Sequence, residues 1–495
     1  MIDRQRLLND LKPVLREIEA DLRARCDEIP QIDAGLKTEY EQARAADRTG
    51  VTYEEWRADL ITQVAVAWVL SCVFVRFLED NDLISPPRIS GPLHGAGTDA
   101  GLHRARDERE TYFKTHPKQT DRDYLLAVFD DLAKLPGTKD VFGAHNPALA
   151  PAFRSWLSGD AAQKLIEFFQ KIDADGSGEI IHDFTDPYRG SQGGGWDTRF
   201  LGDLYQDLSE AARKKYALLQ TPIFVEEFIL DRTLEPAIQE FGLTAQGGFK
   251  MIDPACGSGH FLLGAFARLL RRWRQREPGT SDRELILRAL AGIHGVDLNP
   301  YAIAIARFRL LIAVLRECRI TKLADAPAFV FNLACGDSLL HGAPGNEQQL
   351  LGFHELAHAY QGEDLPELQR ILTPGRYHAV VANPPYITVK DKALNQAYRE
   401  RYPEVCHMKY SLSVPFLQRL VDLTCPNGFT GQITANSFMK REFGKKLVES
   451  YLPKIDLTHV IDTSGAYIPG HGTPTVIVFG RGRAPLAPSM RIVMG

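Results

Sequence analysis

The chain has 495 residues, which is too long for a single hydrophobic core and fits about two or three domains. Hydrophobic residues make up 44% and charged residues 24%, which excludes disorder, collagen-like repeats and a coiled-coil rod. The 58 Lys and Arg against 63 Asp and Glu give a net charge of -5, which excludes a small basic protein that coats nucleic acid. A nucleic-acid enzyme with a local basic face remains allowed.

The first part of the sequence predicts an all-helical N-terminal domain over residues 1–198. Apolar residues recur every three or four positions in 7–18 and 125–132, and a stretch rich in Gly, Asp and Ser over 177–196 is typical of a linker. The most apolar segment, 61–78, is interrupted by Gln63 and Arg76. We therefore expect a buried core helix there and no membrane span.

After residue 245 the pattern changes to alternating strands and helices. This alternation predicts a doubly wound α/β sheet in a catalytic domain over 199–485, followed by a tail over 486–495. Such sheets bind ligands at the carboxyl ends of their strands, so the residues directly after each strand are the candidate site. The expected strands are 249–252, 293–296, 329–331 and 378–381, and the expected helices between them are 261–273 and 300–318.

The first of these strands ends in the string DPACGSGHF, residues 253–261. A strand, a glycine turn and a helix place backbone amides and a helix N-terminus against a bound nucleoside. The third glycine of the dinucleotide fingerprint is absent, since Leu262 stands in its place, and the next strand-end acid, Asp297, is too far along the chain. A dinucleotide oxidoreductase is therefore disfavoured.

Acidic residues also follow the next two strands. Asp297 can accept both hydroxyls of a ribose; the alternative is a helix cap before Pro300, a role that Asn299 can fill instead. Asp337 can accept from an exocyclic adenine amine, and on its own it is equally a turn residue. The recurrence of acids after successive strands favours a nucleoside site.

The string Asn383-Pro384-Pro385-Tyr386 follows the fourth strand and carries the most chemical information. Two prolines make this a stiff loop that aims the Asn383 amide oxygen and the Pro384 carbonyl at one point. Two converging acceptors suit an amino group with two hydrogens. Tyr386 offers a flat face on which a base swung out of a duplex can stack. The alternative is a turn with a buried tyrosine.

The strings DPACGSGHFL, GVDLNP, GDSLL and NPPY, in this order, resemble the S-adenosylmethionine-dependent amino-methyltransferases of DNA. The string YALLQTP, which ends in Thr221 and Pro222, lies upstream of the glycine turn and resembles the element that contacts the methionine end of the cofactor. This order matches the gamma class, as in Type I modification subunits, and implies methylation of adenine N6 with S-adenosyl-L-methionine as cofactor. The resemblance implies the following cofactor-binding residues: Thr221, Pro222, Asp253, Ala255, Gly257, Gly259, Asp297, Leu298, Asp337, Ser338 and Asn383. It implies the following catalytic residues: Asn383, Pro384, Pro385 and Tyr386.

The longer string from Asn383 to Val405 resembles the methyltransferases of BREX (phage growth limitation) defence systems. This resemblance implies a cytoplasmic enzyme whose partners are double-stranded DNA and other phage-defence proteins or phage inhibitors, with no membrane and no metal. No two of the seven cysteines form a CxxC pair, and their scatter fits a reducing compartment. Two alternatives stay open: a cofactor-binding scaffold or sensor with little activity, and a Type I-like modification subunit.

The last part of the sequence is basic. From Pro385 onward there are 14 Lys and Arg against 8 Asp and Glu. A face for the phosphates of DNA is therefore expected, with a solvated helix as the alternative. Its candidate contacts are Lys390, Lys392, Arg399 and Arg401. In the gamma class a target-recognition region follows the last catalytic strand. We expect that region to be missing here and DNA recognition to need a longer form or a partner.

Overall fold

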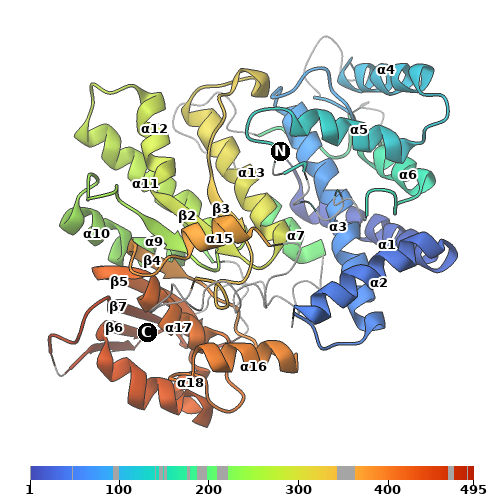
Figure 1. Cartoon of the computed structure of the whole chain (residues 1–495). Helices are drawn as coiled ribbons and strands as arrows, with labels where there is room; N and C mark the ends of the chain where they lie inside the picture. Colours follow the sequence, from blue (N-terminus) through green and yellow to red (C-terminus); the bar gives the residue numbers. More distant parts are fainter. Residues whose placement is uncertain are drawn as a thin grey trace. The chain divides into compact units, whose positions relative to one another are not determined.

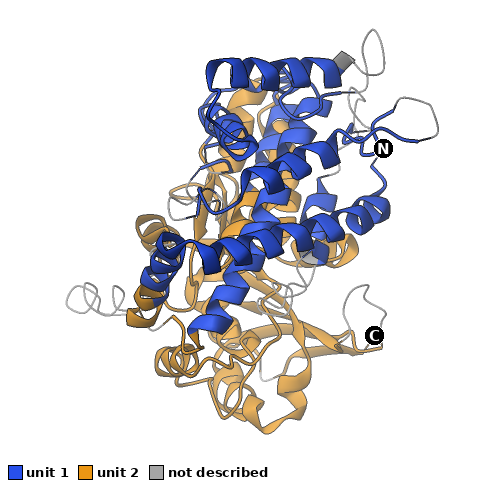
Figure 2. Cartoon of the chain, turned by 90° about the vertical axis from the view of Figure 1, so that its right-hand side faces the viewer, with its two compact units in different colours: residues 1–40, 53–213, 307–329 blue, residues 41–52, 214–306, 330–495 orange. Residues whose placement is uncertain are grey.

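The computed structural model describes residues 2–46, 48–92, 100–139, 141–143, 146, 149, 153–174, 179–186, 198–208, 221–342, 363–465, 473–487 and 489–494. The chain divides into two compact units, coloured separately in Figure 2. The helical unit comprises 1–40, 53–213 and 307–329, and the sheet unit comprises 41–52, 214–306 and 330–495. The domain boundaries expected from the sequence stay a prediction, and most of the expected linker lies outside the described residues.

The helical unit is built from amphipathic helices whose starts carry recognisable caps. Asp3 accepts from the backbone N–H of Arg6 at the start of α1, and Ser158 accepts from that of Ala161 at the start of α6. Its helices are α1 (Arg4–Glu28), α2 (Pro30–Ala45, whose last turn belongs to the sheet unit), α3 (Tyr53–Asp80), α4 (Ala100–Thr115), α5 (Asp121–Ala133), α6 (Gly159–Phe169) and α7 (Arg199–Leu208).

Helix α3 contains the apolar segment that the sequence predicts to be a core helix. By length and composition, α3 is the one described helix that could cross a membrane. Every residue from Val64 to Asp80 is buried within the protein. Burial of this whole stretch agrees with the sequence prediction, because a helix that is apolar on all sides needs protein around it.

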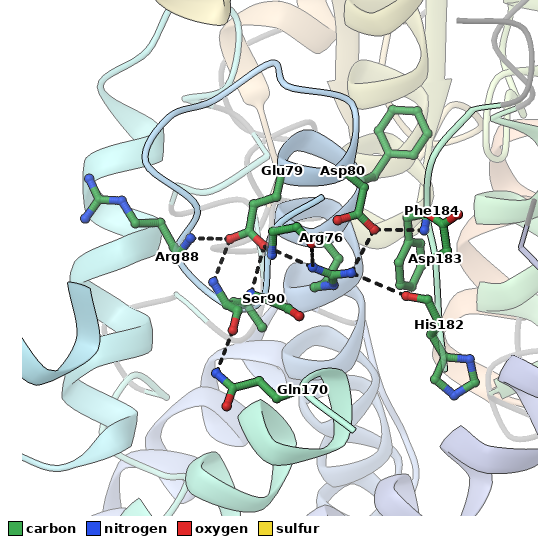
Figure 3. A network of polar contacts seen from close by, with 12 residues as sticks. Arg76, Glu79, Asp80, Arg88, Ser90, Gln170, His182, Asp183 and Phe184 are labelled. Atoms are coloured by element: carbon green, nitrogen blue, oxygen red, sulfur yellow. Dashed lines mark hydrogen bonds and ion pairs between the residues drawn. The ribbon is translucent and has the colours of Figure 1, made fainter. Parts of the chain in front are cut away.

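The end of α3 holds a buried ionic network, drawn in Figure 3. Arg76 donates to the Asp80 carboxylate at 2.7 Å and lies 3.3 Å from that of Glu79, and all three side chains are fully buried. The Glu79 carboxylate accepts from four consecutive backbone N–H groups, those of residues 88–91. Asp80 accepts from the backbone N–H of Phe184. The network therefore anchors two irregular segments, which come from distant parts of the chain, to one helix.

Replacement of Arg76 by alanine is expected to lower the free energy of unfolding by about 3–5 kcal/mol, because it leaves two buried carboxylates without their cation. Denaturant unfolding followed by circular dichroism measures this loss. Lys37→Ala is the matched control. It removes a solvent-exposed partner of Asp33 and should cost less than about 1 kcal/mol. Equal stability of the two variants would contradict the structural role of Arg76.

Among the residues that the structure describes, the sheet unit contains one eight-stranded sheet in the order β3-β2-β1-β4-β5-β7-β6-β8. Figure 1 labels the strands from β2 to β7. The strands from β3 to β5 are mutually parallel, and β7 runs antiparallel to both β5 and β6. The strands are β1 (Met251–Asp253), β2 (Ile293–Asp297), β3 (Asn332–Cys335), β4 (Tyr377–Ala382), β5 (Thr424–Ala435), β6 (Asp456–Asp462), β7 (Thr475–Arg481) and β8 (Arg491–Met494). Successive strands are added to one side of β1 as far as β3 and to its other side from β4 onward. The strand order therefore reverses between β1 and β4, and the carboxyl ends of these parallel strands lie beside this point, where a ligand is expected.

Helices cover both faces of the sheet, which confirms the doubly wound class. One face packs against α9 (Ile223–Arg232), α10 (Leu234–Phe241), α11 (His260–Arg276) and α12 (Asp282–Ala291). The other packs against α15 (Leu365–Ile371), α16 (Lys392–Arg401) and α17 (Ser413–Leu423), whose buried residues share one core with the strands. Helix α13 (Pro300–Glu317) follows β2, and α18 (Ser437–Lys440) follows β5.

The structure differs from the sequence expectations at two strands. The third strand begins at Asn332, after the expected segment 329–331, and Val330 within that segment is 73% exposed. The apolar run led to a wrong prediction. Composition alone does not distinguish a buried strand from an exposed segment that leads into a strand. At the other edge, Arg491–Met494 form β8, which pairs in parallel with β6 within the region expected to be a tail.

Candidate active site

The turn after β1 brings backbone N–H groups to the start of α11. Gly257 and Gly259 both have positive φ, and a Cβ at Gly259 would lie 3.1 Å from the Cβ of Ala306. Both observations explain why glycine is needed at position 259. Asp253 is buried at the base of the turn, where its carboxylate accepts from the backbone N–H of Ala255 at 3.0 Å. The turn thus offers backbone donors above one buried acid.

The second acid lies at the end of the neighbouring strand β2. The two carboxylate oxygens of Asp297 accept from the backbone N–H groups of Gly257 and Asn299, at 2.9 and 2.8 Å. Asn299 in turn accepts from the backbone N–H of Tyr301 at 3.0 Å, which confirms that Asn299 fills the capping role. Asp297 therefore does not serve as the N-cap of the helix that follows. Leu298, the next residue, is 38% exposed and offers an apolar surface beside the acid.

Burial sets the electrostatics of both acids. It raises the pKa of the Asp253 carboxyl well above its usual range, and the negative charge of Asp297 raises it further against the opposing hydrogen bond from Ala255. Burial also raises the pKa of Asp297 to about 6, although its two backbone donors oppose the rise. A buried acid and a neighbouring half-buried acid, both with raised pKa values, favour a ligand that brings positive charge and hydrogen-bond donors.

Asp337, at the end of β3, is already engaged by the protein itself. One carboxylate oxygen accepts from the backbone N–H groups of Leu339 and Leu340. The other accepts from the Tyr398 hydroxyl at 2.6 Å and lies 3.8 Å from the Arg48 guanidinium. The neighbouring Ser338 hydroxyl donates to the Pro254 carbonyl and joins the end of β3 to the first turn.

The loop after β4 is joined to the segment before α9. The Asn383 amide nitrogen donates to the Thr221 hydroxyl at 3.2 Å, and the Tyr386 hydroxyl donates to the Asn383 amide oxygen at 2.6 Å. Asn383 and Tyr386 are half-buried, whereas Pro384 and Thr221 are buried. These contacts fix the direction of the Asn383 amide. Pro222 is the N-cap residue of α9 and lies next to Thr221 in the chain.

The four predicted phosphate contacts differ in what surrounds them. Lys390 and Lys392 are exposed. Arg399 is half-buried, donates to the Met408 carbonyl at 2.6 Å and lies over the Tyr410 ring, so the protein itself engages it. Arg401 is half-buried at the end of α16. The two lysines are thus the most accessible of the four.

Sequence reasoning missed three residues that surround Asp337: Arg48, Glu363 and Tyr398. Arg48 donates to Glu363 at 2.8 Å, and both side chains are almost fully buried. No sequence signal could have identified Arg48, because nearly three hundred residues separate it from Asp337. The tyrosine lies in the buried stripe of a short helix, a pattern that also occurs in ordinary cores.

Comparisons with known proteins identify the family model and the relatives that this chain resembles. Residues 291–468 match the family model of the Eco57I restriction-modification methylases. The whole chain is 49% identical to the "Adenine-specific methyltransferase PglX" of Streptomyces coelicolor, and it spans 42% of the length of that relative.

Two solved structures share the fold at low sequence identity. One is a DrdV-DNA complex, with a TM-score of 0.55, 12% identity and coverage of 99% of this chain and 43% of that one. The other is the Type ISP restriction-modification enzyme LlaBIII bound to DNA, with a TM-score of 0.54, 13% identity and coverage of 99% and 30%. Together with the strand order, these similarities support the doubly wound, Rossmann-like α/β fold predicted from the sequence.

Proposed function

Because this chain is homologous along its whole length to the adenine-specific methyltransferases of the PglX type, we propose that it methylates the N6 amine of a flipped adenine in DNA. The observation that carries the proposal is the orientation of Asn383, fixed by Thr221 and Tyr386. The loop that holds it follows β4, the strand next to β1, whose turn carries Asp253. The methyl donor of this proposal is S-adenosylmethionine.

The residues around the first two strands fit this cofactor. Buried Asp253, with its raised pKa, suits the ammonium group of the methionine moiety, and Asp297 suits the ribose hydroxyls. Exposed Leu298 offers a surface for the adenine ring, and the backbone at Gly257 and Gly259 leaves room for close approach. The cofactor, when bound, supplies a methyl group on a positively charged sulfur.

The residues of the β4 loop act on the amine. The adenine N6 lone pair is conjugated into the ring, so the amine is a poor nucleophile. The Asn383 amide oxygen and the Pro384 carbonyl accept its two hydrogens. This shifts the nitrogen towards a tetrahedral geometry and frees the lone pair. Tyr386 and Thr221 hold the Asn383 amide in that orientation before the base arrives, so little reorganisation is needed. The Tyr386 ring supplies the stacking surface.

Affinity for the cofactor is expected to fall as the pH falls through about 6. The ionised Asp297 carboxylate accepts the ribose hydroxyls, and protonation removes an acceptor; its pKa of about 6 in the unbound protein sets the midpoint. The ionised fraction at pH 5 is about one tenth, so the Kd should be roughly tenfold weaker than at pH 7. Calorimetric titrations with S-adenosylhomocysteine between pH 5 and 8 measure this. A constant Kd over that range would exclude Asp297 as the ribose acceptor.

The proposed setting is a cytoplasmic BREX-type phage-defence system, and its supports are the similarity to PglX and the string that begins at Asn383. Double-stranded DNA is the proposed partner. Lys390 and Lys392 are the most accessible candidate phosphate contacts, and DrdV and LlaBIII, which share the fold, were solved with DNA. Other phage-defence proteins or phage inhibitors are further proposed partners.

The test is methyl transfer from labelled S-adenosylmethionine to mixed unmethylated DNA, followed by digestion to nucleosides. Label in N6-methyladenine supports the proposal. Cofactor binding without label would favour the scaffold or sensor alternative, or a need for a longer chain or a partner that delivers DNA. Absence of cofactor binding would refute the proposal.

A further inference from the structure

Helix α17 carries a fully buried cation that contacts the residues after β3. The Arg419 guanidinium donates to three backbone carbonyls, those of residues 338, 341 and 342, at 2.8, 2.7 and 2.7 Å. A fourth bond, at 3.2 Å, reaches the carbonyl of Leu372, directly after α15. A buried guanidinium is costly unless its donors are satisfied, and within the described residues every hydrogen bond of Arg419 goes to a backbone carbonyl. No sequence motif singles out Arg419, and the proposed mechanism does not use it.

Residues 338–342, here called the β3 turn, are also held by a buried tyrosine. The Tyr402 hydroxyl, directly after α16, donates to the Leu339 carbonyl at 2.9 Å. Four of the five carbonyls of the β3 turn therefore accept from Arg419 or Tyr402. Gly342 has a positive φ, and a Cβ there would lie 2.4 Å from a backbone carbonyl oxygen and 2.9 Å from the Arg419 guanidinium. This close packing requires glycine at position 342.

The backbone N–H groups of the β3 turn bond to the acid that precedes it. One carboxylate oxygen of Asp337 accepts from the N–H groups of Leu339 and Leu340, at 2.9 and 3.2 Å. The peptide groups of the turn thus join Asp337 on one side to Arg419 and Tyr402 on the other. Arg419 therefore fixes the direction of the Asp337 carboxylate through the peptide groups of the turn.

The Asp337 carboxylate retains capacity for one more donor. A carboxylate has about four acceptor positions, and hydrogen bonds from Leu339, Leu340 and Tyr398 take three of them. The remaining position suits the adenine amine of the cofactor, the role expected for Asp337 from the sequence. A hydrogen bond to a charged acceptor is strong only when its geometry is good, so the bond from the amine depends on the direction of the carboxylate.

Helix α17 also starts beside the loop that holds Asn383. The backbone N–H of Leu412, directly before α17, donates to the Ile387 carbonyl at 2.9 Å, and Ile387 follows Tyr386 in the chain. One helix is thus joined to the proposed target-base loop at its start and to the β3 turn through Arg419.

We infer that Arg419 is a positioning residue that, through the β3 turn, directs the Asp337 carboxylate towards the adenine amine of the cofactor. Tyr402 supports the same turn. The inference rests on the proposed function and deepens it, since it names the side chains that make the cofactor site selective for an adenine nucleoside. Loss of either support lets the carboxylate turn away, so selectivity for the amine falls while the contacts to the rest of the cofactor remain.

Selectivity is measured with S-adenosylhomocysteine and its purine counterpart, in which a hydrogen replaces the amine. Calorimetry gives the Kd of each ligand, and the ratio of the two Kd values isolates the contribution of the amine. For the wild-type protein the counterpart should bind at least about tenfold more weakly, as expected for one hydrogen bond to a charged acceptor. Arg419→Lys keeps the charge but has one nitrogen in place of three, and it should lower the ratio to below about threefold.

Tyr402→Phe is the milder variant and decides the test if Arg419→Lys does not fold. It removes only the hydroxyl that bonds to Leu339 and should lower the ratio about threefold. Tyr410→Phe is its matched control, because it removes a buried hydroxyl that donates to the Asn395 carbonyl at 2.8 Å, within α16. The two tyrosine variants should lose similar stability, but only Tyr402→Phe should change the ratio.

Arg481→Lys is the control for Arg419→Lys, because the buried Arg481 donates to the Asn427 carbonyl near the start of β5, away from the site. It should keep the wild-type ratio. A ratio that stays at the wild-type value in both Arg419→Lys and Tyr402→Phe would overturn the inference. Equal binding of the two ligands by the wild-type protein, or an equal fall of the ratio in the controls, would also overturn it.

Failure of the wild-type protein to bind S-adenosylhomocysteine would overturn the proposed function and, with it, this role for Arg419. The two failures are distinguishable, since only the second abolishes cofactor binding by the wild-type protein.

Discussion

Replacement of Asn383 by alanine is expected to lower methyl transfer by about 10²–10³-fold, the usual loss when one oriented polar group is removed from a transition state. The amide oxygen accepts one hydrogen of the amine only as the nitrogen changes geometry, so the loss falls on the chemical step. The Kd of S-adenosylhomocysteine should change by less than about threefold, because Asp253 and Asp297 remain in place. Single-turnover transfer and calorimetry measure the two quantities separately.

Asn332→Ala is the matched control for Asn383→Ala. Asn332 begins β3, at the strand end away from the active site, and its amide donates to the Ile293 carbonyl. Its loss should affect stability modestly and leave the transfer rate within about twofold. Unchanged transfer in Asn383→Ala would refute the assigned role. A large loss in the Asn332 control would show that the assay responds to stability instead of chemistry.

Replacement of Asp297 by alanine is expected to raise the Kd of S-adenosylhomocysteine at least about 100-fold. The loss combines two hydrogen bonds from ribose hydroxyls to a charged acceptor, each of which contributes about 1.5–3 kcal/mol. It also frees the N–H of Gly257, which donates to Asp297 at 2.9 Å and shapes the turn. Calorimetry at pH 7.5 measures the affinity, and thermal unfolding shows whether the fold persists.

Asp297→Asn separates charge from shape. The amide keeps one acceptor oxygen, so affinity at pH 7.5 should fall less than in Asp297→Ala. The pH dependence between 5 and 7 should also disappear, because no titrating group remains at position 297. Asp282→Asn, at an exposed helix start, is the control and should keep both the affinity and its pH dependence. Retention of the pH dependence in Asp297→Asn would assign it to another group, with Asp253 the first candidate.

The sequence was most informative where a local pattern of residues is compatible with only one local structure. Largely apolar runs followed by polar residues predicted β2 and β4 closely, because strands buried on both faces are mostly apolar and ligand-facing residues follow them. The cap at Asn299 was also predictable, since capping involves only residues a few positions apart. The resemblance of short motifs then pointed to the site, because these motifs lie where the strands end.

The sequence was less informative where several conformations fit one pattern. The apolar residues 329–331 match a strand, but Val330 is exposed and the pairing with β2 begins at Asn332. Likewise, the short apolar stretch Ile492–Met494 gave no sign of a strand. Strand formation there needs its partner β6, whose paired residues lie 32 positions earlier in the chain, as in the pair His459 and Arg491.

By itself, the sequence determined the class of fold, the acids at the strand ends and the Asn383–Tyr386 loop, because each depends on neighbours in the chain. Only the tertiary structure decided that Asn383 donates to Thr221 and that the Tyr398 hydroxyl donates to Asp337. The physical reason is the range of the interactions. Hydrogen bonds and ion pairs between distant segments depend on how the chain folds back, and no local pattern of residue types encodes a single such pairing.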